Sequence, residues 1–182
     1  MDSSDSSSCS SSVTAEPQSQ KDFHSLHDTW TMYAHLPHDT DWSIDSYKAI
    51  LQMNTLEECI ALFEAIPKEM TQNCMLFLMR DNIKPLWEDV RNRKGGSFSF
   101  KVNTSNVHST WKDLCYSVIG NTISDNNVLK EKLNGITISP KRNFCIVKLW
   151  MSDCSTKTLK NMKHIPHLNT REALFRKHNP EY

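Results

Sequence analysis

Short segments with a two-residue apolar period are interleaved with helical segments, and this arrangement constrains the fold more than any other feature of the chain. The period is clearest at 97–102 and 145–150, where alternate residues are apolar. Further strand candidates are Trp30–Leu36, Tyr47–Met53, Met75–Arg80 and Glu172–Lys177. Several links between these strands are too short for the crossover that parallel strands need. The pattern predicts an α+β fold, an antiparallel sheet with helices packed on one face.

Three helices are expected between the strands. The first begins near residue 54, where Asn54 with Glu57, or Thr55 with Glu58, supplies an N-cap pair, and it ends at Pro67. Its apolar residues recur at helical spacing: Leu56, Cys59, Ile60, Phe63 and Ile66. The second runs over Ser105–Ile119 and carries the apolar stripe Val107, Trp111, Leu114, Cys115 and Val118 before Gly120. The third lies near Ser155–His164 and ends before Pro166.

The first 20 residues include nine Ser and too few apolar residues to form a core. We expect a disordered Ser-rich tail over 1–22 and one folded domain over 23–182. The N-terminus lacks the basic and apolar regions of a secretory signal. No apolar run nears the roughly 20 residues that cross a bilayer, so we expect no contact with a membrane.

Lys and Arg together number 21, as do Asp and Glu, which excludes a broadly basic nucleic-acid coat and an acidic solvating protein. The six Cys include no C-x-x-C pair, and most lie in apolar stretches. Buried, reduced thiols of this kind are typical of intracellular proteins. We therefore expect a protein of the cytoplasm, with the nucleus as a second compartment. We also expect the chain to be a monomer.

The common catalytic signatures, a G-x-S-x-G elbow, H-E-x-x-H, a P-loop and G-x-G-x-x-G, are all absent from the sequence. We therefore expect a protein that is not an enzyme and needs no cofactor. The pairs His24/His27 and His164/His167 leave a small metal-dependent hydrolase open, but a zinc site would need two more ligands, so we expect no metal. The pair Gly95 and Gly96, between two predicted strands, indicates a hairpin turn.

Three Trp stand outside the periodic apolar patterns. Trp42 lies in a polar stretch, Trp87 at the edge of a charged loop, and Trp150 on the strand face opposite the apolar residues. Such residues either cover a sheet edge or bind a flat aromatic ligand, and composition favours neither. Glu88 adds a specific possibility, because indoles can stack on guanine while a carboxylate accepts two N–H groups from its Watson–Crick edge. An N7-methylated guanine is cationic and would also gain cation–π attraction.

Residues 80–96 read RDNIKPLWEDVRNRKGG, a stretch that resembles the translation initiation factor 4E family of mRNA 5′-cap-binding proteins. The other Trp also fall in the family's order at compatible spacing: Trp30, Trp42, Trp111 and Trp150. The resemblance covers roughly residues 24–178. It implies a curved antiparallel sheet of about seven or eight strands, with three helices on the convex face and the ligand in the concave face.

The resemblance also implies which residues form the cap site. Trp42 and Trp87 would sandwich the 7-methylguanine, and Glu88 would accept its N1–H and N2–H groups. Trp150 would contact the N7-methyl group. The basic residues expected at the phosphates are Lys141, Arg142, Lys148 and Arg176. Ile146 and Ser97 stand where the family has Lys and Arg, so we expect a smaller phosphate contribution than in the family.

The helical back of the sheet is the second site that the resemblance implies. The family binds helical peptides there, from initiation factor 4G-like scaffolds and from 4E-binding repressors. The matching residues are His24, Leu26, Leu56, Ile60, Phe63, Trp111 and Asp113. Ile60 replaces an anchoring Trp, which predicts a different or weaker partner unless Ile60 belongs to the core. An interaction adaptor or translational repressor with weak cap binding is the alternative function, and activation versus repression stays open.

Overall fold

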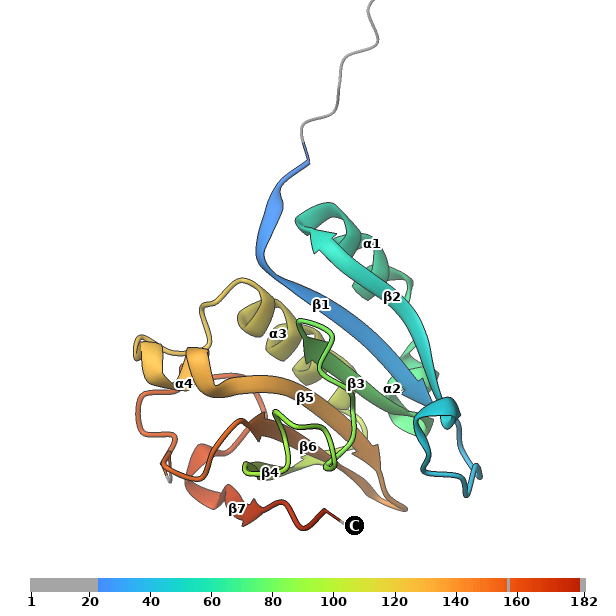
Figure 1. Cartoon of the computed structure of the whole chain (residues 1–182). Helices are drawn as coiled ribbons and strands as arrows, with labels where there is room; N and C mark the ends of the chain where they lie inside the picture. The colour runs from blue at the N-terminus through green and yellow to red at the C-terminus, as the bar shows by residue number, and fades with distance from the viewer. Residues whose placement is uncertain (1–22, 157, 181–182) are drawn as a thin grey trace, which may run out of the picture.

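A computed structural model of the chain describes residues 23–156 and 158–180. The predicted Ser-rich tail, 1–22, lies outside the described residues. Seven strands form one antiparallel sheet in the described residues, in the order β2-β1-β3-β5-β6-β4-β7. The strands are β1 (Ser25–His35), β2 (Tyr47–Thr55), β3 (Met75–Arg80), β4 (Gly96–Asn103), β5 (Leu133–Pro140), β6 (Phe144–Met151) and β7 (Leu174–Lys177). The predicted curved antiparallel sheet is confirmed (Figure 1).

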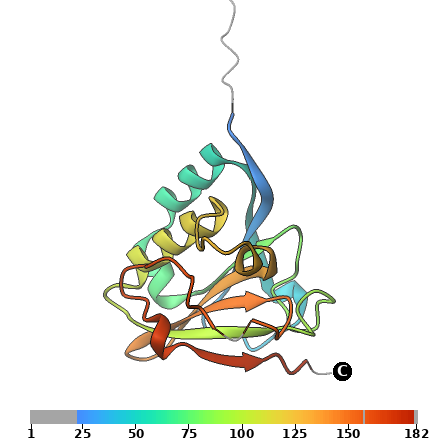
Figure 2. The same ribbon diagram turned by 90° about the vertical axis from the view of Figure 1, so that its left-hand side faces the viewer.

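Within 23–156 and 158–180, four helices connect the strands: α1 (Leu56–Ala65), α2 (Lys68–Asn73), α3 (Val107–Ile119) and α4 (Asn127–Lys132). The two longer ones, α1 and α3, lie together on one side of the sheet (Figure 2). Short 3-10 turns precede β2 at Ile44–Ser46 and β7 at Thr170–Glu172. None of the helices in the described part of the chain is long and apolar enough to span a bilayer.

The two-residue period places apolar side chains on both faces of the sheet, where they form two clusters. Phe98, Phe100 and Val147 point toward the helices and join the main core. The opposite face carries a smaller cluster of Phe77, Met79, Ile83 and Trp150. Burial of both faces at the centre of the sheet leaves the concave side with an aromatic floor.

Of the two predicted N-cap pairs, Thr55 with Glu58 is the one that caps helix α1. The Thr55 hydroxyl accepts the Glu58 N–H at 3.3 Å, and the Glu58 carboxylate accepts the Thr55 N–H at 3.0 Å. Such a capping box satisfies two of the free donors of a first helical turn. The helix then buries Cys59 and Phe63 and ends before Pro67.

The predicted third helix is wrong. The described residues of 155–164 contain a turn and irregular backbone, and Met162 forms an isolated bridge with Ser124. The Lys163 N–H donates to the Ile123 carbonyl at 2.8 Å, and the Ser124 hydroxyl donates to the Asn161 carbonyl at 2.7 Å. The segment therefore satisfies its backbone against residues 123–124 instead of forming the bonds of a helix.

The predicted hairpin turn at Gly95 and Gly96 is also wrong, since β3 and β4 are not neighbours in the sheet. Gly95 ends a long loop, and Gly96 is the first residue of β4. A Cβ atom at Gly95 would collide with the Met151 carbonyl, and one at Gly96 with the Phe175 ring and the Arg176 carbonyl. Glycine is needed here because neighbouring chain segments approach the backbone closely.

Candidate functional site

A cavity of about 460 Å³ opens on the face of the sheet opposite the main core. Two loops and the concave sides of the central strands line it: Trp42, Tyr47, Met75, Phe77, Pro85, Leu86, Trp87, Glu88, Thr137, Ser139, Lys148, Trp150 and Asn179. The volume lies within the range of small-molecule sites, as does the combination of aromatic walls with few polar groups. The structure thus brings together all four residues predicted to hold a base, and Lys148 beside them.

The three predicted base-binding Trp differ in exposure. Trp42 is 53% exposed and Trp87 is 38% exposed, whereas Trp150 is only 4% exposed. Trp150 points away from the main core, as the alternation of residues in 145–150 predicts. It packs on Phe77, however, and so its ring is not exposed. Trp42 and Trp87 therefore form accessible walls, and Trp150 forms a buried part of the floor.

Asn92 organises the loop between β3 and β4, which carries Trp87. Its fully buried amide donates to the Lys84 carbonyl at 2.9 Å and to the Leu86 carbonyl at 2.8 Å. Its own side-chain oxygen accepts the Asn134 amide at 3.0 Å, and Asn134 also donates to the Arg91 carbonyl at 2.7 Å. A single side chain thus ties both flanks of Trp87 to strand β5.

Glu88 and Asp89 are adjacent carboxylates with different surroundings. The Asp89 carboxylate accepts the Lys84 N–H at 3.0 Å and the Arg91 N–H at 2.8 Å, so it holds the loop in shape. Glu88 is exposed, lines the cavity, and makes no hydrogen bond or ion pair with any other described residue. Burial, reinforced by the Glu88 charge, raises the pKa of Tyr47 to about 12. The cavity therefore presents a free acceptor, Glu88, and a phenol that keeps its proton at neutral pH.

The loop that carries Trp42 is closed by its own short polar side chains. The Asp41 carboxylate accepts the N–H and the hydroxyl of Ser43, both at 2.8 Å. These hydrogen bonds hold the pKa of Asp41 below its usual range. Asp39 in turn accepts the Asp41 N–H at 3.0 Å. The loop keeps this arrangement while Asp41 is ionised, and would loosen only as the pH falls through the lowered pKa.

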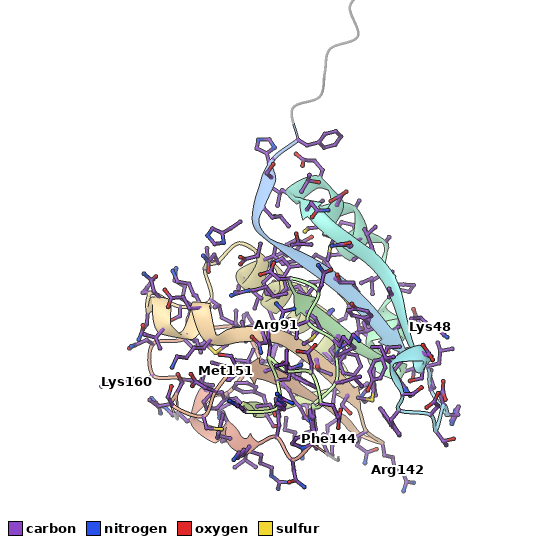
Figure 3. All side chains as sticks on the ribbon, in the orientation of Figure 1. Lys48, Arg91, Arg142, Phe144, Met151 and Lys160 are labelled. Atoms are coloured by element: carbon purple, nitrogen blue, oxygen red, sulfur yellow. The ribbon has the colours of Figure 1, made fainter. Side chains whose placement is uncertain are left out.

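The four predicted phosphate contacts do not all lie at the cavity. Lys148 lines it, with its ammonium 5.9 Å from the centre of the Trp87 ring. Burial, followed by the positive charges of Lys141 and Arg176, lowers the pKa of Lys148. Arg142 projects from the turn between β5 and β6 and is not part of the lining (Figure 3). Of the four predicted cations, Lys148 lines the cavity, whereas Lys141, Arg142 and Arg176 lie outside the lining.

Sequence reasoning missed several lining residues, such as Tyr47 and Phe77, and also four residues that support the site: Asn92, Asn134, His35 and His178. Asn92 and Asn134 lie in polar or mixed stretches where nothing in the local pattern marks an asparagine as buried. The two histidines stack on the exposed Trp: His35 on Trp42 and His178 on Trp87. Only the contacts of the folded chain reveal these roles.

We expect Asn92→Ala to lower the free energy of unfolding by about 2–3 kcal/mol, because it leaves several buried polar groups without partners. Chemical denaturation followed by circular dichroism measures this loss. Asn103→Ala, an exposed position on β4, is the control and should change stability by less than about 0.5 kcal/mol. Equal stability of both variants would contradict the role of Asn92 as the organiser of the loop.

The residues predicted to bind a partner on the helical back fall into two groups. Leu56 and Ile60 are 41% and 46% exposed, so Ile60 is not a core residue. His24 and Asp113 are exposed, and Leu26 is half-buried. The His24 ring lies 2.7 Å from the Glu57 carboxylate, which fixes the start of β1 to α1. Phe63 and Trp111 are a correction: both are fully buried in the main core and support this surface from beneath.

In the described part of the chain, the histidines of the pairs His24/His27 and His164/His167 do not act together as a metal site. His24 contacts Glu57, His27 contacts Asp28 at 2.9 Å, and His167 contacts Asn106 at 3.3 Å. Among the described residues no group of three or more His, Cys, Asp or Glu side chains could hold a metal ion.

Comparison with known proteins identifies relatives over nearly all of the described chain. The family described as eukaryotic initiation factor 4E matches residues 25–179. Eukaryotic translation initiation factor 4E of Eremothecium gossypii is 34% identical over 140 residues, which are 71% of this chain and 64% of that protein. The Candida albicans factor is 26% identical over 165 residues, 83% of this chain and 77% of that protein. The chain thus spans slightly less than two thirds of the Eremothecium relative.

Solved structures agree with the sequence relatives. The crystal structure of Ascaris suum eIF4E-3 with m7G cap has a TM-score of 0.64 and 26% identity, over 74% of this chain and 76% of that one. Schistosome eIF4E, complexed with m7GpppG and 4E-BP, has a TM-score of 0.67 at 20% identity, over 74% and 75% of the two chains, and shows the shared fold. Because the family match covers residues 25–179 and the fold agrees, the chain belongs to the eukaryotic initiation factor 4E family.

Proposed function

We propose that the chain binds the 7-methylguanosine cap of mRNA in its concave cavity, as a binding protein and not as an enzyme. The observation that carries the proposal is a cavity with two accessible indoles, Trp42 and Trp87, and an unpaired carboxylate, Glu88, on its rim. The similar Ascaris suum protein was solved with an m7G cap, which supports the same ligand here.

Each part of the cap has a complementary group in the cavity. The cationic 7-methylguanine would stack between Trp42 and Trp87 and gain cation–π attraction from both rings. The Glu88 carboxylate would accept the N1–H and N2–H groups, which pairs opposite charges as well as forming two hydrogen bonds. Trp150 on the floor would contact the N7-methyl group. Unmethylated guanine lacks the positive charge and would bind less tightly.

A resin carrying m7GTP tests the proposal. We expect the chain to be retained and to elute with free m7GTP but not with the same concentration of GTP. A chain that passes through, or that elutes equally with both nucleotides, would favour the alternative function, an adaptor or repressor with weak cap binding.

The positive charges of Lys148, Lys141 and Arg176 predict that affinity rises from the mono- to the di- to the triphosphate cap analogue and falls with added salt. Lys148→Ala should weaken m7GTP binding by about tenfold, because it removes one charge-assisted hydrogen bond worth about 1.5 kcal/mol. Isothermal titration at two salt concentrations measures both effects. Lys130→Ala, on α4 and outside the cavity lining, is the control. Equal affinity for all three analogues would remove these cations from the site.

We also propose that the helical back binds a helical peptide from an initiation factor 4G-like scaffold or a 4E-binding repressor. Leu56 and Ile60 are its exposed apolar residues, one helical turn apart on α1. Whether such a partner makes this chain an activator or a repressor depends on the identity of that partner.

The exposed Ile60 predicts weak binding of a generic 4G-type peptide, about 2 kcal/mol or thirtyfold weaker than to a surface with an anchoring Trp. Ile60→Trp should raise the affinity for that peptide in a fluorescence anisotropy titration. Binding of m7GTP should not change, since Ile60 is not part of the cavity. Tight binding of the generic peptide by the unmodified chain would show that Ile60 does not alter partner choice.

A further inference from the structure

Two buried histidines lie against the two exposed Trp of the cavity. His35, at the end of β1, stacks on Trp42 with ring centres 4.2 Å apart and ring planes within 6°. His178, immediately after β7, stacks on Trp87 with centres 5.7 Å apart and planes within 11°. The histidines are only 2% and 3% exposed.

The histidines lie behind the indoles as seen from the cavity. Trp42 and Trp87 both line the cavity, whereas neither His35 nor His178 does. Each imidazole therefore covers one face of its indole, and the other face remains available to a ligand. Aromatic pairs in such offset-parallel arrangements are worth about 0.5–1.5 kcal/mol beyond the area they bury.

Each histidine also bonds to the loop that carries its Trp. His35 donates from Nε2 to the Asp41 carbonyl at 2.8 Å, one residue before Trp42. His178 donates from Nδ1 to the Asn92 carbonyl at 2.8 Å, within the loop that carries Trp87. A carbonyl oxygen can only accept, so the bonded ring nitrogen must carry the proton in each case. Both loops are thus held to the sheet by a stacked ring and a hydrogen bond from the same side chain.

From this matched arrangement, and resting on the proposed cap binding, we infer that His35 and His178 are positioning residues that hold Trp42 and Trp87 open toward the ligand before it arrives. A wall that is already ordered does not lose side-chain and loop freedom on binding, which raises affinity without any new contact to the ligand. The bound state would then be a stack of five layers: His35, Trp42, the base, Trp87 and His178.

The surroundings of His178 bear on its protonation, and charged or titratable groups also lie around His35. Glu88 from the loop and Lys148 from β6 face His178, and the Asp41 carboxylate and Tyr47 ring face His35. Burial lowers the pKa of His178, and its Nε2 has no partner among the described residues, so a second proton there would lack an acceptor. Protonation would also place a positive charge behind Trp87 and oppose a cationic base.

The test begins with the empty protein. The five Trp of the chain, labelled as 5-fluorotryptophan, should give five ¹⁹F resonances. We expect His35→Ala to shift the Trp42 resonance and His178→Ala those of Trp87 and Trp150, since His178 also contacts Trp150 at 4.9 Å. Trp30 and Trp111, deep in the core, should be unmoved. Unchanged Trp42 and Trp87 resonances in folded alanine variants would overturn the inference.

The second part measures m7GTP affinity. Each alanine variant should bind about five- to tenfold more weakly, and His178→Phe, which keeps a ring behind Trp87, should recover most of the loss. His108→Ala, a partly buried histidine on α3, is the control and should bind normally. If an alanine variant fails to fold, His178→Phe and His178→Asn test the inference instead. His178→Phe, which keeps a ring, should preserve m7GTP binding, and His178→Asn, which has only an amide, should not. Normal binding by His178→Asn would overturn the inference.

A pH series separates positioning from a general loss of structure. The affinity of the wild type divided by that of His178→Phe should decrease as the pH is lowered from 7.5 to 5, because only the wild type gains a proton behind Trp87. Titration of the ligand affects both proteins equally and so cancels in this ratio. A constant ratio would contradict the role of the neutral imidazole. If the wild type bound no m7GTP, the proposed function would fail, while the ¹⁹F shifts would still decide whether the histidines order the Trp.

Discussion

Replacing Trp87 with alanine is expected to abolish retention on m7GTP resin and to weaken m7GTP binding in solution by a hundredfold or more. Loss of one stacked aromatic ring costs about 1–3 kcal/mol per base, and loss of its cation–π attraction adds about 1–2 kcal/mol. Trp87 is 38% exposed, and the loop around it is held by Asn92 and Asp89, so its removal should leave the fold intact. Fluorescence titration measures the affinity, and the thermal midpoint checks folding.

Val90→Ala is the matched control for Trp87→Ala. Val90 lies in the same loop and is 67% exposed, so its truncation removes apolar surface close to Trp87 without touching the cavity lining. It should bind m7GTP within about twofold of the wild type. Normal cap binding by a folded Trp87→Ala variant would show that the base binds elsewhere.

Glu88→Ala is expected to give the second-largest effect, a loss of about 1.5–3 kcal/mol in m7GTP binding, or roughly 10- to 150-fold. The reason is that the N1–H and N2–H groups of the base would be left without an acceptor inside a largely aromatic cavity. Because Glu88 has no partner within the described chain, the variant should keep its thermal stability. Isothermal titration with m7GTP measures the loss.

Two variants of the same loop sharpen this result. Glu88→Gln keeps the shape but removes the charge, and its amide N–H groups would oppose the donors of the base, so its loss should approach that of alanine. Asp89→Ala removes the carboxylate that holds the loop, so it should lower thermal stability as well as affinity. If Glu88→Ala bound m7GTP normally while Asp89→Ala bound it weakly, Asp89 and not Glu88 would be the carboxylate that accepts the base.

The fold was largely predictable because the burial of alternate residues follows from the two-residue period. The expected strand Met75–Arg80 has the bounds of β3, and Phe98, Phe100 and Val102 face the core as their spacing predicts. Strand β5 was missed because Gly135 and Pro140 are poor strand formers, although Ile136 and Ile138 alternate with polar residues there. Residues 155–164 were misjudged because local spacing cannot show that a distant segment, 123–124, takes up their backbone hydrogen bonds.

The site was predictable where it depends on uncommon residue types. Trp42, Trp87 and Trp150 could be singled out in the sequence because core packing does not explain an indole outside a periodic apolar pattern. Glu88 could be singled out with them because it directly follows Trp87. The supporting residues carry no such mark. Asn92 is one polar residue among many in its loop, and His178 lies 91 positions after Trp87, so only the fold brings them together. Chemistry can therefore be anticipated from residue types, whereas the side chains that orient it require the structure.

A crystal structure of the chain with m7GTP tests the central claim most directly. We predict the 7-methylguanine ring between Trp42 and Trp87, its Watson–Crick edge on the Glu88 carboxylate, and its phosphates directed toward Lys148. His35 and His178 should remain stacked on the outer faces of the two indoles. A base bound at any other surface, or a cavity left empty at saturating m7GTP, would contradict the account.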